Sequence, residues 1–278
     1  MKHTLAFMLL LLVAALPCGA QSAPAPAFEA ASIKRNTSGD SRWYGGVNTT
    51  QPGAVRLTNM PLQNIIYNAY GVDFLMQRFL VTGGPQNILS EHFDVDAVPP
   101  EGSAPSQKLA MLQTLLAERF KLRVHIEKRQ VPTYAVTVAR QGKLGPQLRP
   151  SSLDCEAFLK ARSQNRTLEQ PRGGDGKEIC NRYDFPSDHS RALGIGDSGS
   201  MALLARRLQS FADRIVIDDT GLTGNFEWTM SMPSSEWATD QAGALLGAVQ
   251  DQLGLRLRPR TAPMDVLVID SVEMPTAN

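Results

Sequence analysis

The chain has 278 residues, with 28 lysines and arginines against 27 aspartates and glutamates, and a formal net charge of +1. Such a balance provides no bulk electrostatic attraction to nucleic acid or to an anionic membrane surface, so neither is expected as a partner. The length is sufficient for one large domain or two ordinary ones, each with a core.

The first residues, 1–20, read as a signal peptide. Lys2 precedes an apolar run over residues 5–16, and small residues follow at 18–20. A bilayer-spanning helix needs about 20 apolar residues, so we expect no transmembrane anchor after cleavage. A proline beside the cysteine of this segment disfavours lipidation. We predict a secreted or periplasmic protein that begins with an Ala/Pro linker at 21–27.

Cys155 and Cys180 are the two cysteines that remain after cleavage. An even pair in an exported protein predicts a disulfide. Closing the polar, Gly-rich stretch between them would stabilise the fold by roughly 3 kcal/mol on the chain-entropy model. The alternative is a metal or redox pair, which would call for a C-x-x-C spacing or nearby histidines.

The chain contains similar segments at a constant separation of 133 residues, which places Phe226 at the position of Phe93. The paired segments are 91–95 with 224–228, 111–124 with 244–257, and 131–138 with 264–271. A shared register through helix, loop and strand predicts one supersecondary unit used twice.

The first unit is predicted at 28–140. Its expected strands are 28–34, 55–57, 92–98, 122–126 and 134–138, the last two forming a hairpin with a turn near 130–132. A Thr-Asn-Met-Pro start signal at 58–61 and an apolar stripe predict a buried helix that ends at Gly71. Ser106 is expected to cap a second helix that ends near Phe120.

The second unit is predicted at 191–278, after a polar connector at 141–190 that contains the cysteine pair. Its expected elements are a strand at 193–195, a helix at 200–211, strands at 214–218 and 225–230, a helix at 240–253 closed by Gly254, and a hairpin of 255–258 with 266–269. The fold class is therefore α+β, as two tandem β-α-β-β-α-β-β units. Each would be a small mixed sheet covered by two helices.

Several segments resemble an uncharacterised secreted family of soil bacteria, of acidobacterial type, which is known only as a domain of unknown function. The segments that carry this resemblance are 28–34, 69–72, 82–85, 116–122, 219–226 and 266–270. The resemblance covers nearly all of the chain after the linker. It implies an extracytoplasmic location and brings no catalytic residues with it.

Each half is also similar to the short N-terminal domain of secretins and TonB-dependent transducers, a β-α-β-β-α-β module that docks other envelope proteins. In the second half the similar segments are 201–205, 215–218, 244–246, 253–257 and 266–269. The first half departs from this pattern by an additional opening strand. The similarity implies a docking function.

His92, Asp94 and Asp96 alternate along one face of a predicted strand. Imidazole and carboxylate groups at this spacing are candidate ligands for a divalent metal. The alternative is a solvated polar face, and the equivalent positions of the second half, Asn225, Glu227 and Thr229, do not preserve the ligand set. We therefore assign no metal and no cofactor, and keep these three residues as candidates.

Basic residues alternate with apolar ones on both predicted hairpins. They are Lys121, Arg123 and His125 in the first half and Arg256 and Arg258 in the second. Such a face could attract an acidic partner, but charged strand faces commonly serve to keep sheet edges soluble.

A Gly-Asp-Ser-Gly-Ser string at 196–200 resembles the nucleophile segment of chymotrypsin-type proteases. Because it opens a predicted helix, Asp197, Ser198 and Ser200 are interpreted as capping residues. The chain has no H-E-x-x-H, G-x-S-x-G, P-loop or Rossmann motif, so no catalytic residue is assigned.

These features favour an exported, non-enzymatic module that binds or docks an envelope protein or an extracellular ligand. The alternative is a small secreted hydrolase with a carboxylate-lined site between the halves, around His92, Asp94 and Asp96 or around Asp218 and Asp219.

Overall fold

The computed structural model describes residues 25–46, 53–164, 167–184, 193–233 and 239–275. The predicted signal peptide and most of the linker lie outside these ranges. Within them the protein is mixed α+β, with seven helices and three four-stranded sheets. Among these helices, none has the length and apolar character that a membrane crossing needs.

The first lobe is built on a sheet with the strand order β1-β5-β3-β2. Its strands are β1 (Ala30–Arg35), β2 (Tyr44–Gly45), β3 (Val55–Pro61) and β5 (His92–Val98). Its helices are α1 (Leu62–Ala69), α3 (Gln86–Leu89) and α4 (Pro105–Phe120). The alternate residues of β5 point into the core, where Phe93 meets Phe120 edge to face at 5.0 Å between ring centroids.

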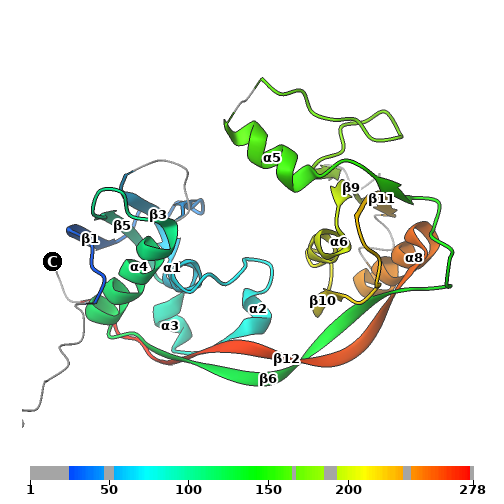
Figure 1. The fold of residues 1–278 in the computed structure, drawn as a ribbon. Helices are drawn as coiled ribbons and strands as arrows, with labels where there is room; N and C mark the ends of the chain where they lie inside the picture. Colours follow the sequence, from blue (N-terminus) through cyan, green and yellow to red (C-terminus); the bar gives the residue numbers. More distant parts are fainter. Residues whose placement is uncertain (1–24, 47–52, 165–166, 185–192, 234–238, 276–278) are drawn as a thin grey trace, which may run out of the picture.

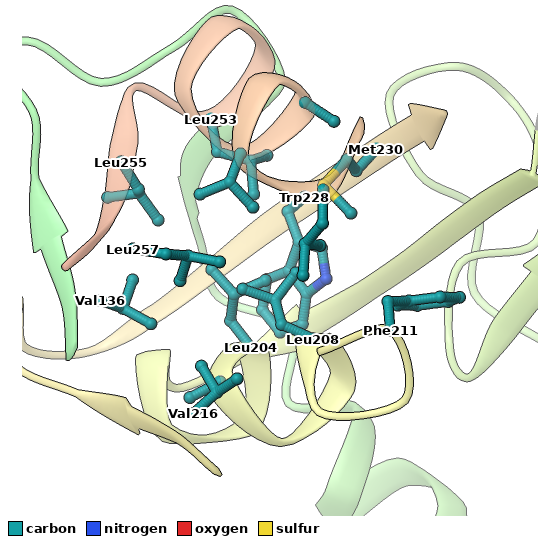
Figure 2. Packing of buried hydrophobic residues seen from close by; sticks show 14 of the residues in the cluster. Val136, Leu204, Leu208, Phe211, Val216, Trp228, Met230, Leu253, Leu255 and Leu257 are labelled. Atoms are coloured by element: carbon teal, nitrogen blue, oxygen red, sulfur yellow. The ribbon is translucent and has the colours of Figure 1, made fainter. Parts of the chain in front are cut away.

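The second lobe is built on a sheet with the order β7-β11-β9-β8. Its strands are β7 (Leu148–Ser151), β8 (Arg182–Asp184), β9 (Leu193–Gly199) and β11 (Asn225–Met232). Its helices are α5 (Cys155–Gln164), α6 (Met201–Leu208) and α8 (Gln241–Leu253). Figure 2 shows Trp228 of β11 inside this core, against Leu204 and Leu208 of α6. The strands β7 and β8 come from the predicted connector.

A two-stranded ribbon joins the lobes (Figure 1). It consists of β6 (Arg123–Val138) and β12 (Leu255–Ser271), which pair antiparallel along their whole length. The short strands β10 (Ile215–Asp218) and β4 (Val81–Gly83) extend it in parallel, one beside β6 and the other beside β12. The central sheet therefore has the order β10-β6-β12-β4.

The two predicted terminal hairpins are wrong, because β6 and β12 each run straight through the expected turn. Val136 of β6 is buried in the second lobe, whereas Leu267 and Ile269 of β12 are buried in the first. Each half thus donates its last strand segment to the core of the other half. A turn was predicted near Pro132, but this residue lies in the central part of the ribbon, as does Pro263. There each strand has one unpaired edge that tolerates a missing N–H.

The centre of the ribbon is buried on its other face. There Val131 and Val266 pack with Ile215 and with Phe79 of α2 (Gln77–Leu80). The twist of a two-stranded ribbon explains this change of face, because it turns one side toward the lobes at both ends and the opposite side toward α2 in the middle.

Helix boundaries were predicted with mixed success. Residues 58–61 belong to β3 rather than to a first helical turn, since Met60 and Pro61 pair with β5 across an irregularity at Asn59. The N-cap of α4 is Ala104 instead of Ser106. The left-handed C-cap at Gly254 is confirmed, with φ of 67°.

The sheets of the two lobes have the same strand order, in that each reads first, fourth, third and second strand in chain order. β5 and β11 are inner strands of their sheets, and Phe93 and Phe226 are the second residues of these strands. On the ribbon, Gln130 pairs with Pro263, which lies 133 positions later in the chain. The ladder is therefore centred on two residues whose separation equals that of the similar sequence segments.

The exchanged strands predict that neither half folds alone. Residues 28–140 and 141–278, produced separately, are expected to lack cooperative unfolding in circular dichroism, because each would expose the apolar face that the other half's strand covers. Mixed in equal amounts, the two fragments should regain a cooperative transition. Independent cooperative folding of either fragment would contradict the prediction.

Candidate functional site

A groove of about 620 Å³ lies where the first lobe meets the second. Its walls come from α1, from the residue preceding β2, from the segment 74–78 and from the residues that follow α6. Its polar lining residues are Gln63, Asn64, Gln77, Gln209, Ser210 and the single cation Arg78. Among the described residues that line it there is no carboxylate, histidine or cysteine.

Three aromatic side chains, together with Pro61 and Leu75, form the apolar part of the groove. Trp43 is 39% exposed and Phe74 63% exposed, and their ring centroids lie 6.4 Å apart with planes tilted by 44°. Tyr67 of α1 completes the set, and burial raises the pKa of its phenol, which keeps the O–H protonated as a donor. Exposed apolar groups gathered on one concave surface are typical of an interaction site.

A buried asparagine holds the loop that carries Trp43. The Nδ2 atom of Asn59 donates to the backbone oxygens of Asp40 at 2.6 Å and of Arg42 at 2.8 Å. Asn59 has a positive φ of 53°, and its own N–H donates to Asp94 Oδ1 at 2.8 Å. The loop before β2 is therefore fixed at two points by one side-chain nitrogen, and Trp43 with it.

The segment bearing Phe74 is held by the second lobe. Asp73 accepts from Leu75 N at 2.9 Å and pairs with Arg206 of α6 at 3.2 Å. The guanidinium of Arg78 donates to the backbone oxygen of Ala212. The position of this wall thus depends on how the two lobes meet.

A smaller cavity of about 190 Å³ adjoins the groove through Arg78 and Ser210. Tyr134 lines it, with the guanidinium of Arg214 lying 5.2 Å from its ring centroid. Burial first, and then the negative charge of Asp213, raise the pKa of this tyrosine. The phenol is therefore a neutral group of the lobe boundary rather than a base.

The structure ties the predicted metal candidates into the first sheet. His92 Nδ1 lies 2.8 Å from the backbone oxygen of Asn59, and Asp94 accepts from Asn36 Nδ2 at 2.9 Å. Asp96 pairs with Arg56 at 3.1 Å. The three side chains do not converge on one point among the described residues. The metal candidates stay a prediction, and Asp94 has a structural use in holding Asn59.

The predicted basic face is divided between the two ends of the ribbon. Arg123 stands opposite Ser271, whereas Arg256 stands opposite Thr137, 14 residues farther along β6 and roughly 45 Å away at about 3.3 Å per residue. The remaining members also have local surroundings. His125 contacts Asp270 at 2.9 Å, Lys121 donates to Glu118 O at 3.0 Å, and Arg258 stands opposite Ala135. One continuous docking face is not formed by these residues.

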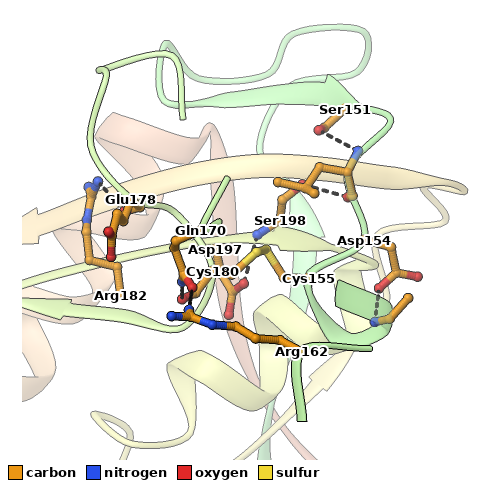
Figure 3. Close-up of a disulfide and its surroundings, with 12 residues drawn as sticks. Ser151, Asp154, Cys155, Arg162, Gln170, Glu178, Cys180, Arg182, Asp197 and Ser198 are labelled. Atoms are coloured by element: carbon orange, nitrogen blue, oxygen red, sulfur yellow. Dashed lines mark hydrogen bonds between the residues drawn. A yellow bond between two sulfur atoms is a disulfide. The ribbon is translucent and has the colours of Figure 1, made fainter. Parts of the chain in front are cut away.

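The disulfide between Cys155 and Cys180 is present, as predicted, and fastens α5 to the chain before β8 (Figure 3). The buried carboxylate of Asp197 lies beside it, with its Oδ2 atom 2.6 Å from Arg207 Nε. Asp197 and Ser198 belong to β9 and do not cap a helix, but Ser200 does cap α6, accepting from Leu203 N at 3.2 Å. This cluster is structural, because both sulfurs are bonded to each other.

The carboxylates of the hydrolase alternative are engaged in turns and ion pairs. Asp218 Oδ1 accepts from Thr220 N at 2.9 Å, and Asp219 Oδ2 lies 3.0 Å from Arg260 Nη1. Neither residue lines the groove. Sequence reasoning missed the groove, although isolated aromatic residues in polar loops, Trp43 and Phe74, were a usable signal.

The fold and the site together define a two-lobed α+β protein with one disulfide and an aromatic groove at the lobe boundary. The chain belongs to the family described as a protein of unknown function (DUF3738), whose family model matches residues 63–272. The predicted membership of an uncharacterised family is thereby confirmed. Comparisons with curated proteins and with solved structures found no match.

Substituting Asn59 tests whether it holds the loop of Trp43. Asn59→Ala is expected to lower the free energy of unfolding by about 2–3 kcal/mol. The substitution removes two hydrogen bonds, and it leaves at positive φ an alanine, whose side chain has no polar group to offset the backbone strain. Asn59→Gly should cost about 1 kcal/mol less, because glycine accepts this backbone conformation. Urea titration measures both variants, and equal losses would contradict the strain component.

Two neighbouring arginines of α6 provide a matched test of the buried ion pair. Arg207→Ala leaves Asp197, whose side chain is 2% exposed, without its partner, and should cost about 3–5 kcal/mol. Arg206→Ala removes a more exposed pair with Asp73 and should cost under about 1 kcal/mol. Thermal unfolding measures the loss of stability in each variant. Similar losses would show that the buried ion pair stabilises the fold no more than the exposed one.

Proposed function

We propose that the protein is an exported, non-enzymatic binding module whose ligand site is the aromatic groove between the lobes. The observation that carries the proposal is the composition of this groove. It combines the exposed rings of Trp43 and Phe74 with amide side chains and has no acid, histidine or cysteine among its described lining residues. Such a surface has the means to hold a ligand, and its described lining residues include no acid or histidine that could act as a general base or activate the Ser210 hydroxyl.

Export is supported by the apolar run near the start of the chain and by the disulfide. The resemblance to secreted soil-bacterial proteins supports the same location. We place the module in the bacterial envelope or outside the cell, where an envelope protein or an extracellular ligand is the partner.

We further propose that the chain consists of two tandem copies of one unit, at residues 28–140 and 191–278. The equivalent strand orders of the two lobe sheets and the centring of the ribbon on Gln130 and Pro263 support this. The similarity of each half to the docking domain of secretins and TonB-dependent transducers supports a docking or sensing function. In this arrangement the groove lies where the two copies meet, a common place for ligand sites.

The proposal is tested by separating binding from turnover. The protein without its signal peptide is expected to show no turnover of ester, peptide, phosphoester and glycoside substrates. It should retain a partner or ligand from an envelope and culture extract, because the groove supplies a preformed surface. Trp43→Ala should abolish retention, whereas Tyr44→Ala, which removes an adjacent exposed ring outside the groove, should not.

A turnover that disappears in Asp218→Asn or in Asp219→Asn would instead establish the hydrolase alternative. Retention that persists in Trp43→Ala would move the binding site away from the groove.

A further inference from the structure

The arrangement of the rings in the groove favours a ligand with flat apolar faces. Trp43 and Phe74 stand beside each other with their planes tilted by 44°, so they present two neighbouring surfaces rather than one slot. Both rings remain substantially exposed, and they are held in place by the Asn59 contacts on one side and by Asp73 and its partners on the other. Rigid aromatic surfaces of this kind contribute contact area at little conformational entropy cost.

The polar groups of the groove favour a ligand that both donates and accepts hydrogen bonds. Gln63 and Asn64 lie on the groove side of α1, and within the described chain their side-chain amides make no hydrogen bond. Each amide offers two N–H donors and a carbonyl acceptor. Gln209, by contrast, is already satisfied, because it donates to Arg214 O at 3.0 Å and accepts from Val216 N at 2.8 Å.

Hydroxyl groups match free amides because each hydroxyl is both a donor and an acceptor. A proline-rich peptide would also fit an aromatic groove. Proline has no backbone N–H, however, so such a peptide offers no donor to the side-chain carbonyls of Gln63 and Asn64. A lipid chain would bury the amides with no partner at all, which is costly. A polyhydroxylated ligand therefore satisfies both the rings and the amides.

The charge of the groove favours a neutral ligand. Arg78 is the one charged residue among its described lining residues, and its guanidinium is already directed to the backbone oxygen of Ala212. An anionic polymer would require several cations along its path. The volume of about 620 Å³ lies within the roughly 300–1,000 Å³ typical of small-ligand sites, and the groove is open to solvent.

We propose that this groove binds a neutral oligosaccharide. Trp43 and Phe74 stack on the C–H faces of successive sugar rings, while Gln63, Asn64 and the Tyr67 phenol bond their hydroxyls. This assignment of ligand class rests on the proposed function of the groove as a binding site.

The test is isothermal titration of the protein with neutral hexasaccharides of defined linkage: cello-, xylo-, manno-, malto-, laminari- and chitohexaose. At least one is expected to bind. Trp43→Ala and the double variant Gln63→Ala, Asn64→Ala should each weaken that binding about tenfold or more, as loss of one stacking surface or of both free amides implies. Trp43→Phe should retain most of the affinity, and Tyr44→Ala should leave it unchanged.

Decaproline and oligogalacturonate serve as the comparison ligands, the first apolar and hydrogen-bond accepting, the second anionic. If no neutral hexasaccharide binds, or if binding survives Trp43→Ala, the inference is overturned. Binding of decaproline alone would overturn the ligand class while leaving a non-enzymatic groove intact. Chromatography of the sugar after incubation detects whether a bound hexasaccharide is also cleaved. Cleavage would preserve the ligand class and reject the proposed non-enzymatic function.

Discussion

The antiparallel pairing of β6 with β12 is the constraint on which the rest of this molecule depends. The same ladder supplies core residues to both lobes, the buried Val136 and Leu257 to the second, and the buried Leu267 with the half-buried Val124 to the first. Each strand thus contributes to two cores, and the lobes are joined by hydrogen-bonded backbone rather than by a flexible linker. A ribbon with both ends packed into cores resists separation of the lobes, because opening it would expose apolar surface at each end.

The groove follows from that constraint. The centre of the ribbon needs cover for Val131 and Val266, and α2 provides it. Placing α2 there brings Arg78 and the preceding loop against the end of α6, and this contact forms one wall of the groove. The opposite wall depends on the first lobe alone, through Asn59. The site therefore joins a wall defined within one lobe to a wall defined by the contact between lobes.

Elements with a strong local pattern could be predicted from the sequence. The apolar stripe of α1, the alternation in β5 and the glycine cap of α8 each reflect burial on one face or a backbone conformation, which neighbouring residues encode. The exchange of strands could not be predicted, because a hairpin and an exchanged pair use the same residues and differ only in the partner. The groove was missed for a related reason, since Trp43 and Gln209 lie far apart in the chain and meet only through tertiary contacts.

The position of β12 has a consequence for biosynthesis. Leu267, Ile269 and Val272 complete the first core, although they belong to the last part of the chain. The amino-terminal lobe is consequently unfinished until the ribosome has passed residue 272, and long-range pairing of this kind closes slowly. The chain therefore stays incompletely folded for most of its synthesis, and the apolar faces that β12 will cover remain exposed during that time.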